Sequence, residues 1–129
     1  MCIRDSIVGY LDPEGGGATV EKIAINAVMA GCRPEYIPVV IAAVEAICEE
    51  AFLLHGVQTT TNPVSPLLIV NGPERERLGI HSGKGAFGPG WRANATIGRA
   101  VRLVMLNIGG ALPIAVDQAV HGMPGKFTM

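Results

Sequence analysis

The sequence predicts an α/β fold in which about three main helices pack on a small sheet, beside a long glycine-rich loop. Three stretches carry apolar residues at helical spacing, and two short β-branched or aliphatic stretches lie between the second and the third. Of the 129 residues, 49% are hydrophobic and 16% charged, which suffices for one domain with a hydrophobic core. Five glycines within residues 79–91 predict the loop.

The two ends differ in character from this domain. The first six residues, MCIRDS, resemble a translated sequencing-adapter artefact, and DPEGGGA at 12–18 is typical of a flexible connector. We therefore divide the chain into an artefactual or flexible segment at 1–18 and a single α/β domain at 19–129. Residues 118–129 contain no evident final element, so we expect the domain to be truncated at its C-terminus.

Capping signals set the expected helix ends. The first helix is expected to follow Thr19, a good N-cap, and to end at Gly31. Pro34 suits the start of a second helix, which should run to about Glu50. That helix is apolar nearly all round, as expected of a central helix or of one that packs on a missing partner. A third helix is predicted at 93–108.

Two strands are predicted between the second and third helices. Residues 57–61 and 67–71 are β-branched or aliphatic, and the turn-forming sequence NPVSP separates them at 62–66. One helical turn is expected at 74–78, just ahead of the glycine-rich loop.

Charge and residue spacing exclude several classes of function. The net charge of −1 gives no electrostatic signature for nucleic acid or an anionic membrane, and no apolar run reaches the roughly 20 residues of a membrane span. The three histidines have no ligand-like spacing, so no metal site is predicted. The three cysteines predict neither a disulfide framework nor a zinc site, which favours a reducing cytoplasm: Cys2, Cys32 and Cys48.

The glycine-rich loop is the main candidate site. Its glycines let the backbone adopt positive φ and approach a ligand closely, and it leads into a helix N-terminus, where free N–H groups favour an anion. The alternative is a glycine-rich crossover followed by a capped helix. The residues expected to hold a phosphate or carboxylate are His81, Ser82, Gly83, Lys84, Gly85, Arg92 and Asn94.

The match to G-x-G-x-x-G at 83–88 is not a dinucleotide fingerprint. That motif follows directly from a strand and opens a helix. Here the nearest predicted strand ends near residue 71, and Pro-Gly follows the third glycine.

Cys32 is a second candidate. A thiol just ahead of a helix N-terminus and next to Arg33 would favour its thiolate form. The alternative is a small buried turn between two helices. Arg99 and Arg102 lie three residues apart on the third helix, where they could reach an acidic group or a partner, or form a solvated face.

Four stretches of 19–126 carry a family resemblance: TVEKIAINAVMAGCRPEYIPVVIAAVEAI, HGVQTTTNPVSPLLIVNG, LGIHSGKGAFGPGWRANATIGRAVRL and NIGGALP. Together they resemble the C-terminal portion of UGSC-family (seleno)proteins, named for a selenocysteine-Gly-Ser-Cys motif in which cysteine often replaces selenocysteine. The resemblance implies thiol or selenol redox chemistry from an N-terminal region, because this chain has no Cys-Gly-Ser-Cys. Trp91 stands where the resemblance leads us to expect a smaller or more polar residue.

Two functional hypotheses follow. In the first, the chain is the substrate- or anion-binding part of a thiol/selenol-dependent oxidoreductase-like enzyme, with Cys32 as its candidate catalytic thiolate. The expected partners are a small anionic molecule, a missing N-terminal domain and, in a homo-oligomer, further copies of the chain. Neither a cofactor nor a substrate can be named. In the second, the chain is a non-catalytic assembly module that packs its apolar helix on a missing domain or another subunit.

Overall fold

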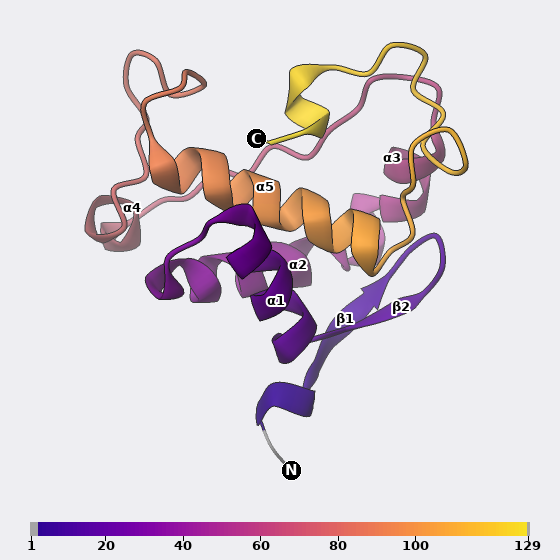
Figure 1. The fold of residues 1–129 in the computed structure, drawn as a ribbon, viewed down its shortest axis with the longest axis horizontal. Helices are drawn as coiled ribbons and strands as arrows, with labels where there is room; N and C mark the ends of the chain where they lie inside the picture. The colour runs from indigo at the N-terminus through magenta and orange to yellow at the C-terminus, as the bar shows by residue number, and fades with distance from the viewer. Residues whose placement is uncertain (1–2, 129) are drawn as a thin grey trace.

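The computed structural model describes residues 3–128 and has a mixed α/β fold. Three long helices, α1 (Val20–Ala30), α2 (Ile37–Ile47) and α5 (Arg92–Asn107), accompany one antiparallel hairpin of β1 (Ile7–Leu11) and β2 (Gly16–Thr19). In Figure 1, α5 crosses the middle of the molecule, with α1 and α2 on one side and the C-terminal segment on the other. Two shorter helices, α3 (Leu54–Thr59) and α4 (Pro73–Arg77), lie in the chain between α2 and α5, and 3₁₀ turns occupy 3–5, 34–36, 50–52 and 124–126.

The helix predictions are confirmed, with local reasons visible at their ends. The Thr19 hydroxyl accepts a hydrogen bond from the N–H of Lys22, and Gly31 ends α1 in a left-handed conformation at φ 86°. The second helix begins at Pro34 as a 3₁₀ turn before α2 takes over, and it ends three residues before the expected Glu50.

The core lies between these three helices and the hairpin. α5 contributes a buried face that includes Ile97, Val104 and Met105, and α1 and α2 pack on it through Ile23 and Val44. Each large apolar side chain buried in this way contributes roughly 1.5–3 kcal/mol of transfer free energy. The remaining buried apolar side chains of this core include Leu11, Ala18, Ala27, Tyr36, Val40, Ile47, Leu54, Leu78, Ala93, Ala100 and Val101.

The α2 helix is not buried on all sides. Its buried face is Val40, Ala43, Val44 and Ile47, whereas the opposite face exposes small or polar residues, as at Ala42 and Glu45. α2 has only 11 residues. Within residues 3–128, no helix is both long enough and apolar enough to cross a membrane.

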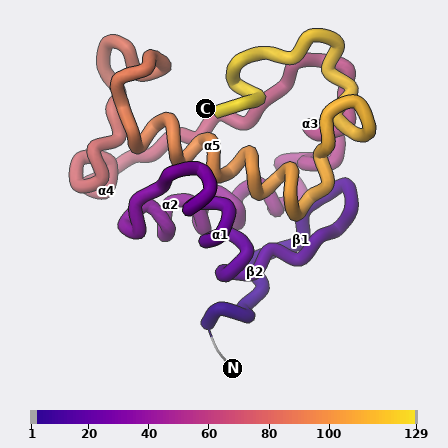
Figure 2. The backbone as a smooth tube through the Cα atoms, viewed as in Figure 1, coloured from indigo at the N-terminus to yellow at the C-terminus, as the bar shows by residue number. Residues whose placement is uncertain are grey.

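Both strand predictions between α2 and α5 are wrong. Residues 57–59 belong to α3, and 67–71 have no regular structure. Pro63 and Pro66 lack N–H groups, so this stretch is a poor ladder partner. Figure 2 shows it running near the C-terminal segment, to which it is tied by the Val120 N–H on the Thr61 carbonyl and the Ser65 hydroxyl on the Gly125 carbonyl.

The sheet comes instead from residues predicted to precede the domain. Leu11 pairs with Gly16 and Ile7 with Thr19, and the buried Leu11 and Ala18 anchor the hairpin to the core. The prediction of a flexible connector at 12–18 is therefore wrong from Gly16 onward. Gly16 is required there, because an added Cβ would lie 1.9 Å from the carbonyl oxygen of Ile108. The artefact prediction for 1–6 falls partly on Met1 and Cys2, which lie outside the described residues.

Candidate functional site

The glycine-rich loop follows α4 as a series of turns and is fastened to the start of α5 by Asn94. The Asn94 carboxamide oxygen accepts the N–H of His81 at 2.9 Å, and its amide group donates to the carbonyls of His81 at 2.9 Å and Ala86 at 3.2 Å. Gly79 and Gly85 take positive φ values of 68° and 77°, which few other residues tolerate. These three hydrogen bonds tie residues 81–86 to the first turn of α5.

His81 and Trp91 form a second fastening. Their rings stack with centroids 3.8 Å apart and planes 18° apart, and the His81 Nε2 lies 3.0 Å from the Lys84 carbonyl. Trp91, unexpected from the family resemblance, therefore has a clear partner. Gly83 fits beside this pair, since an added Cβ would lie 3.1 Å from the His81 ring.

Arg92 joins the start of α5 to the end of α1. Its guanidinium donates to the Gly31 carbonyl at 3.0 and 3.3 Å, where a cation also complements the negative end of the α1 dipole. The Ser82 hydroxyl in turn accepts from Arg75 at 3.2 Å.

The structure thus brings the predicted ligand side chains to one region but gives most of them partners within the chain. The exception is Lys84, whose exposed ammonium has no hydrogen bond or ion pair within residues 3–128. The bonds of Asn94 and His81 to backbone groups at 81–86 show that these two side chains support the loop.

Cys32 lies in the turn between α1 and α2. Its N–H donates to the Ala27 carbonyl, and its thiol donates to the Thr96 carbonyl at 3.2 Å. Burial raises the pKa of Cys32, and the nearby charge of Arg92 opposes this rise only partly. A raised pKa disfavours the thiolate, against the predicted preference, and the catalytic role of Cys32 stays a prediction. A 3₁₀ turn, with little dipole, follows Cys32 in place of an α-helix N-terminus.

A cavity of about 240 Å³ opens beside the loop. It lies between residues 67–70, the loop at 86–88, the first two turns of α5 and the C-terminal segment at 124–128. Its largest lining side chains are apolar: Leu67, Leu68, Val70, Ile80, Phe87 and Ile97.

The N-terminus of α5 meets this cavity without a side-chain cap. Trp91 occupies the capping position and offers no side-chain hydrogen bond, and its carbonyl accepts from Ala95. The N–H groups of Arg92, Ala93 and Asn94 have no acceptor within residues 3–128. Since Ala93 and Asn94 also line the cavity, positive partial charge lies at its wall.

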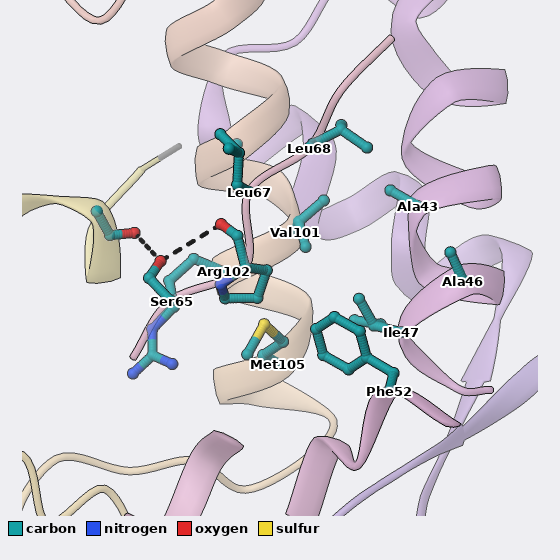
Figure 3. Close-up of a pocket in the computed structure, with 13 residues that line it drawn as sticks. Ala43, Ala46, Ile47, Phe52, Ser65, Leu67, Leu68, Val101, Arg102 and Met105 are labelled. Atoms are coloured by element: carbon teal, nitrogen blue, oxygen red, sulfur yellow. Dashed lines mark hydrogen bonds between the residues drawn. The ribbon is translucent and has the colours of Figure 1, made fainter. Parts of the chain in front are cut away.

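A second cavity of about 100 Å³ continues along α5 (Figure 3). Figure 3 shows Leu67, Leu68, Val101 and Met105 around it, with Phe52 and α2 on the far side. Both cavities share four lining residues: Leu67, Leu68, Gly98 and Gly125.

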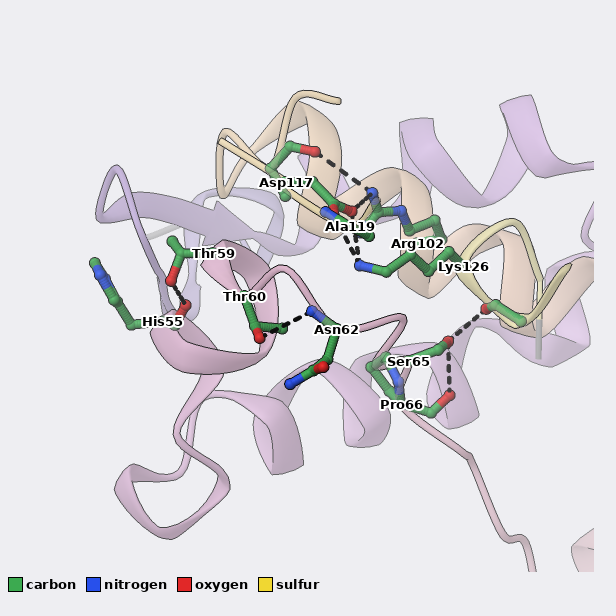
Figure 4. Close-up of polar contacts among 12 residues, drawn as sticks. His55, Thr59, Thr60, Asn62, Ser65, Pro66, Arg102, Asp117, Ala119 and Lys126 are labelled. Atoms are coloured by element: carbon green, nitrogen blue, oxygen red, sulfur yellow. Dashed lines mark hydrogen bonds and ion pairs between the residues drawn. The ribbon is translucent and has the colours of Figure 1, made fainter. Parts of the chain in front are cut away.

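A buried ion cluster fixes the C-terminal segment (Figure 4). Asp117 accepts from the Lys126 ammonium at 2.8 and 3.0 Å, from the Arg102 guanidinium at 3.1 Å and from the Ala119 N–H at 3.1 Å. Only 6% of the Asp117 side chain is exposed. Burial alone would raise the pKa of Asp117, but the Lys126 and Ala119 hydrogen bonds and the two cations outweigh it and hold the pKa below its usual value.

This cluster was not predicted from the sequence, although an acidic group was one of the partners considered for Arg102. A signal was present: Asp117 is the one acidic residue in 77–129, among six basic ones. A lone carboxylate in so basic a stretch has several possible cationic partners.

Neither a metal centre nor a relative identifies the site. Within residues 3–128, no group of three or more His, Cys, Asp or Glu side chains could hold a metal ion. Comparison with protein-family models, with curated proteins and with solved structures finds no match for the chain. The resemblance to UGSC-family (seleno)proteins therefore stays a prediction.

Proposed function

We propose that this chain is the ligand-binding part of a thiol- or selenol-dependent oxidoreductase-like enzyme, and that its ligand is a small anion with an apolar body. The observation that carries the proposal is the cavity of about 240 Å³ between the glycine-rich loop and the first turns of α5. A concave, largely apolar cavity with a few fixed polar groups is the usual form of a small-molecule site. The fastening of the loop by Asn94 and by the His81–Trp91 stack supports a preformed site.

Three features support the anionic group. The uncapped N–H groups of Arg92, Ala93 and Asn94 can donate to an oxyanion, and the α5 dipole favours negative charge at the same place. The Lys84 ammonium is free to turn toward such a group. The excess of basic residues in 77–129 adds a long-range attraction for anions.

The redox part of the proposal rests on the UGSC resemblance. It assigns the thiol or selenol to the N-terminal region that this resemblance implies, and it does not use Cys32, whose pKa is raised by burial. A cytoplasmic setting is part of the proposal, and it agrees with Cys32 and Cys48 being free thiols.

Calorimetric titration with octanoate tests the binding site. We expect saturable binding that weakens as salt is added, and Lys84→Ala should weaken it about two- to fivefold, the effect of one exposed charge. Lys22→Ala is the matched control, because Lys22 bonds to the Gly17 carbonyl on the hairpin. Absence of saturable binding at millimolar octanoate would refute the proposed site.

The assembly hypothesis is supported by α1, whereas the sequence had suggested α2 as the helix that packs on a partner. The long apolar side chains of α2 are largely directed inward, whereas α1 exposes Ile25, Val28 and Met29 along one face. These residues recur at helical spacing, as in a helix that packs on a partner. As a second candidate function, we propose that α1 mediates assembly. Sedimentation equilibrium should then give a mass above one chain that Val28→Glu lowers; a single-chain mass for the parent protein would contradict it.

A further inference from the structure

We infer that the ligand of the proposed site is elongated, and that Gly98 of α5 determines how long its apolar chain can be. The inference rests on the proposed function, because it concerns the same site. It goes further in naming the class of ligand, a straight-chain carboxylate or a molecule with an equivalent tail, and one residue that sets its length.

The two cavities follow one face of α5. The larger is lined by Asn94 and Gly98, and the smaller by Gly98, Val101 and Met105. These positions recur every three or four residues, so they lie on one stripe of the helix. From residue 94 to residue 105 the stripe is roughly 17 Å long at 1.5 Å per residue. A ligand that begins at the N-terminus of α5 and enters both cavities must therefore be elongated.

Gly98 stands where the cavities meet. It is buried and lines both of them, as do Leu67 and Leu68 on the facing segment. Glycine inside a helix destabilises it relative to alanine, so a glycine near the middle of a 16-residue helix calls for a local reason. Its place in the lining of both cavities provides one, because we expect a larger residue at 98 to narrow the passage from one cavity to the other.

The polar side chains along this path already have partners. Asn94 bonds to the loop, Arg102 to Asp117 and the Thr128 hydroxyl to the Ala95 carbonyl, while Ser65 donates to the Gly125 carbonyl (Figure 3). Each of these side chains is bonded within the chain, and most of the other lining residues are apolar, so the cavities offer a ligand mainly apolar contacts. We therefore expect the part of the ligand beyond the first turns of α5 to be an apolar chain.

A chain-length series tests the inference. Hexanoate, octanoate, decanoate and dodecanoate are titrated into the wild-type chain, and affinity should rise about fourfold for each methylene that enters the cavities. In Gly98→Val the affinity for hexanoate should stay close to the wild-type value. The rise in affinity with each added methylene should end at a shorter carboxylate than in the wild type. Gly56→Ala is the matched control, since Gly56 also lies inside a helix but an added Cβ meets nothing within 4 Å. It should leave the series unchanged.

The outcomes separate the inference from the proposed function. If no carboxylate binds, the proposed function fails and the inference fails with it. If carboxylates bind with equal affinity at every length, or if Gly98→Val leaves the full length dependence, the inference alone is overturned. If circular dichroism shows that Gly98→Val does not fold, Gly98→Ala is titrated with the same series instead. The rise in its affinity with chain length should also end early. The 1-alkanols of matching length are titrated as well. If they bind as tightly as the carboxylates, the ligand needs no anionic group, and only the elongated shape of the site stays supported.

Discussion

Asp117→Asn is the change that most directly tests how the C-terminal segment is held. The carboxylate accepts hydrogen bonds from Lys126, Arg102 and the Ala119 N–H, and asparagine can offer only one oxygen in its place. Whichever way the new amide is turned, one of these donors faces an NH2 group, and both cations lose the negative charge that neutralises them. Only 11–12% of the Arg102 and Lys126 side chains is exposed.

The expected cost follows from this burial. Breaking a fully buried ion pair costs about 3–5 kcal/mol, but these cations border an open groove in which water can partly replace the carboxylate. We therefore expect the free energy of unfolding to fall by about 2–3 kcal/mol. Urea denaturation followed by circular dichroism would record this as a midpoint lowered by on the order of 1 M at an unchanged slope.

The matched control is Glu74→Gln. Glu74 pairs with Arg77 across one helical turn, but both side chains are about half exposed, so we expect no measurable change. If Asp117→Asn destabilises the chain no more than Glu74→Gln does, the cluster does not hold the segment and the reasoning is refuted.

The same variant has a pH signature. Because the pKa of Asp117 is lowered in the folded chain, the cluster stabilises fully above the ordinary pKa near 3.8, and this stabilisation is lost as pH falls through the lowered value. The difference in unfolding free energy between wild type and Asp117→Asn should accordingly be constant near neutral pH and shrink only in strong acid. A difference that shrank between pH 5 and pH 7 would point to another group.

Three further predictions concern the loop, the hairpin and the buried thiol. Asn94→Ala removes the bonds to His81 and Ala86; hydrogen exchange at the His81 amide should become much faster, and unchanged exchange would mean that the loop is held in another way. Gly16→Ala should destabilise the chain by more than about 2 kcal/mol in urea, because the new Cβ meets backbone; a smaller loss would mean that the hairpin can shift. Alkylation of Cys32 by iodoacetamide should show an apparent pKa above the ordinary 9.0, and one below it would restore the thiolate hypothesis.

The helices could be predicted because the signals that specify them are local. The Thr19 cap, the left-handed Gly31 and the apolar spacing of 93–108 all act within a few residues. The strands could not be predicted in the same way. A β-branched run becomes a strand only where a partner strand is available, and 67–71 has none among the described residues. The true hairpin was hidden because its glycine-rich second strand has the composition of a connector.

The predicted ligand side chains lie in one region of the structure, but most of them bond to other parts of the chain. A sequence shows that Arg92 and Asn94 stand at a helix N-terminus, yet it cannot show that their partners are the carbonyls of Gly31 and His81. The first of these lies 61 residues away in sequence. Side chains such as these reach whichever acceptor the fold brings near. The residue type therefore indicates that they donate hydrogen bonds, but only the packing determines which acceptor they bind.

Side chains that bond within the chain can be distinguished by experiment from residues that would contact a ligand. Replacing Arg92 or Asn94 should lower stability and binding together, because these side chains hold the wall of the cavity in place. Replacing Gly98 with alanine should change the preferred chain length and leave stability equal or higher, because alanine favours the helix. A substitution that changes binding without loss of stability therefore marks a residue that meets the ligand. By that criterion, we expect the specificity of the proposed site to lie in Gly98 and in the free backbone N–H groups of α5, with Asn94 and His81 keeping both in position.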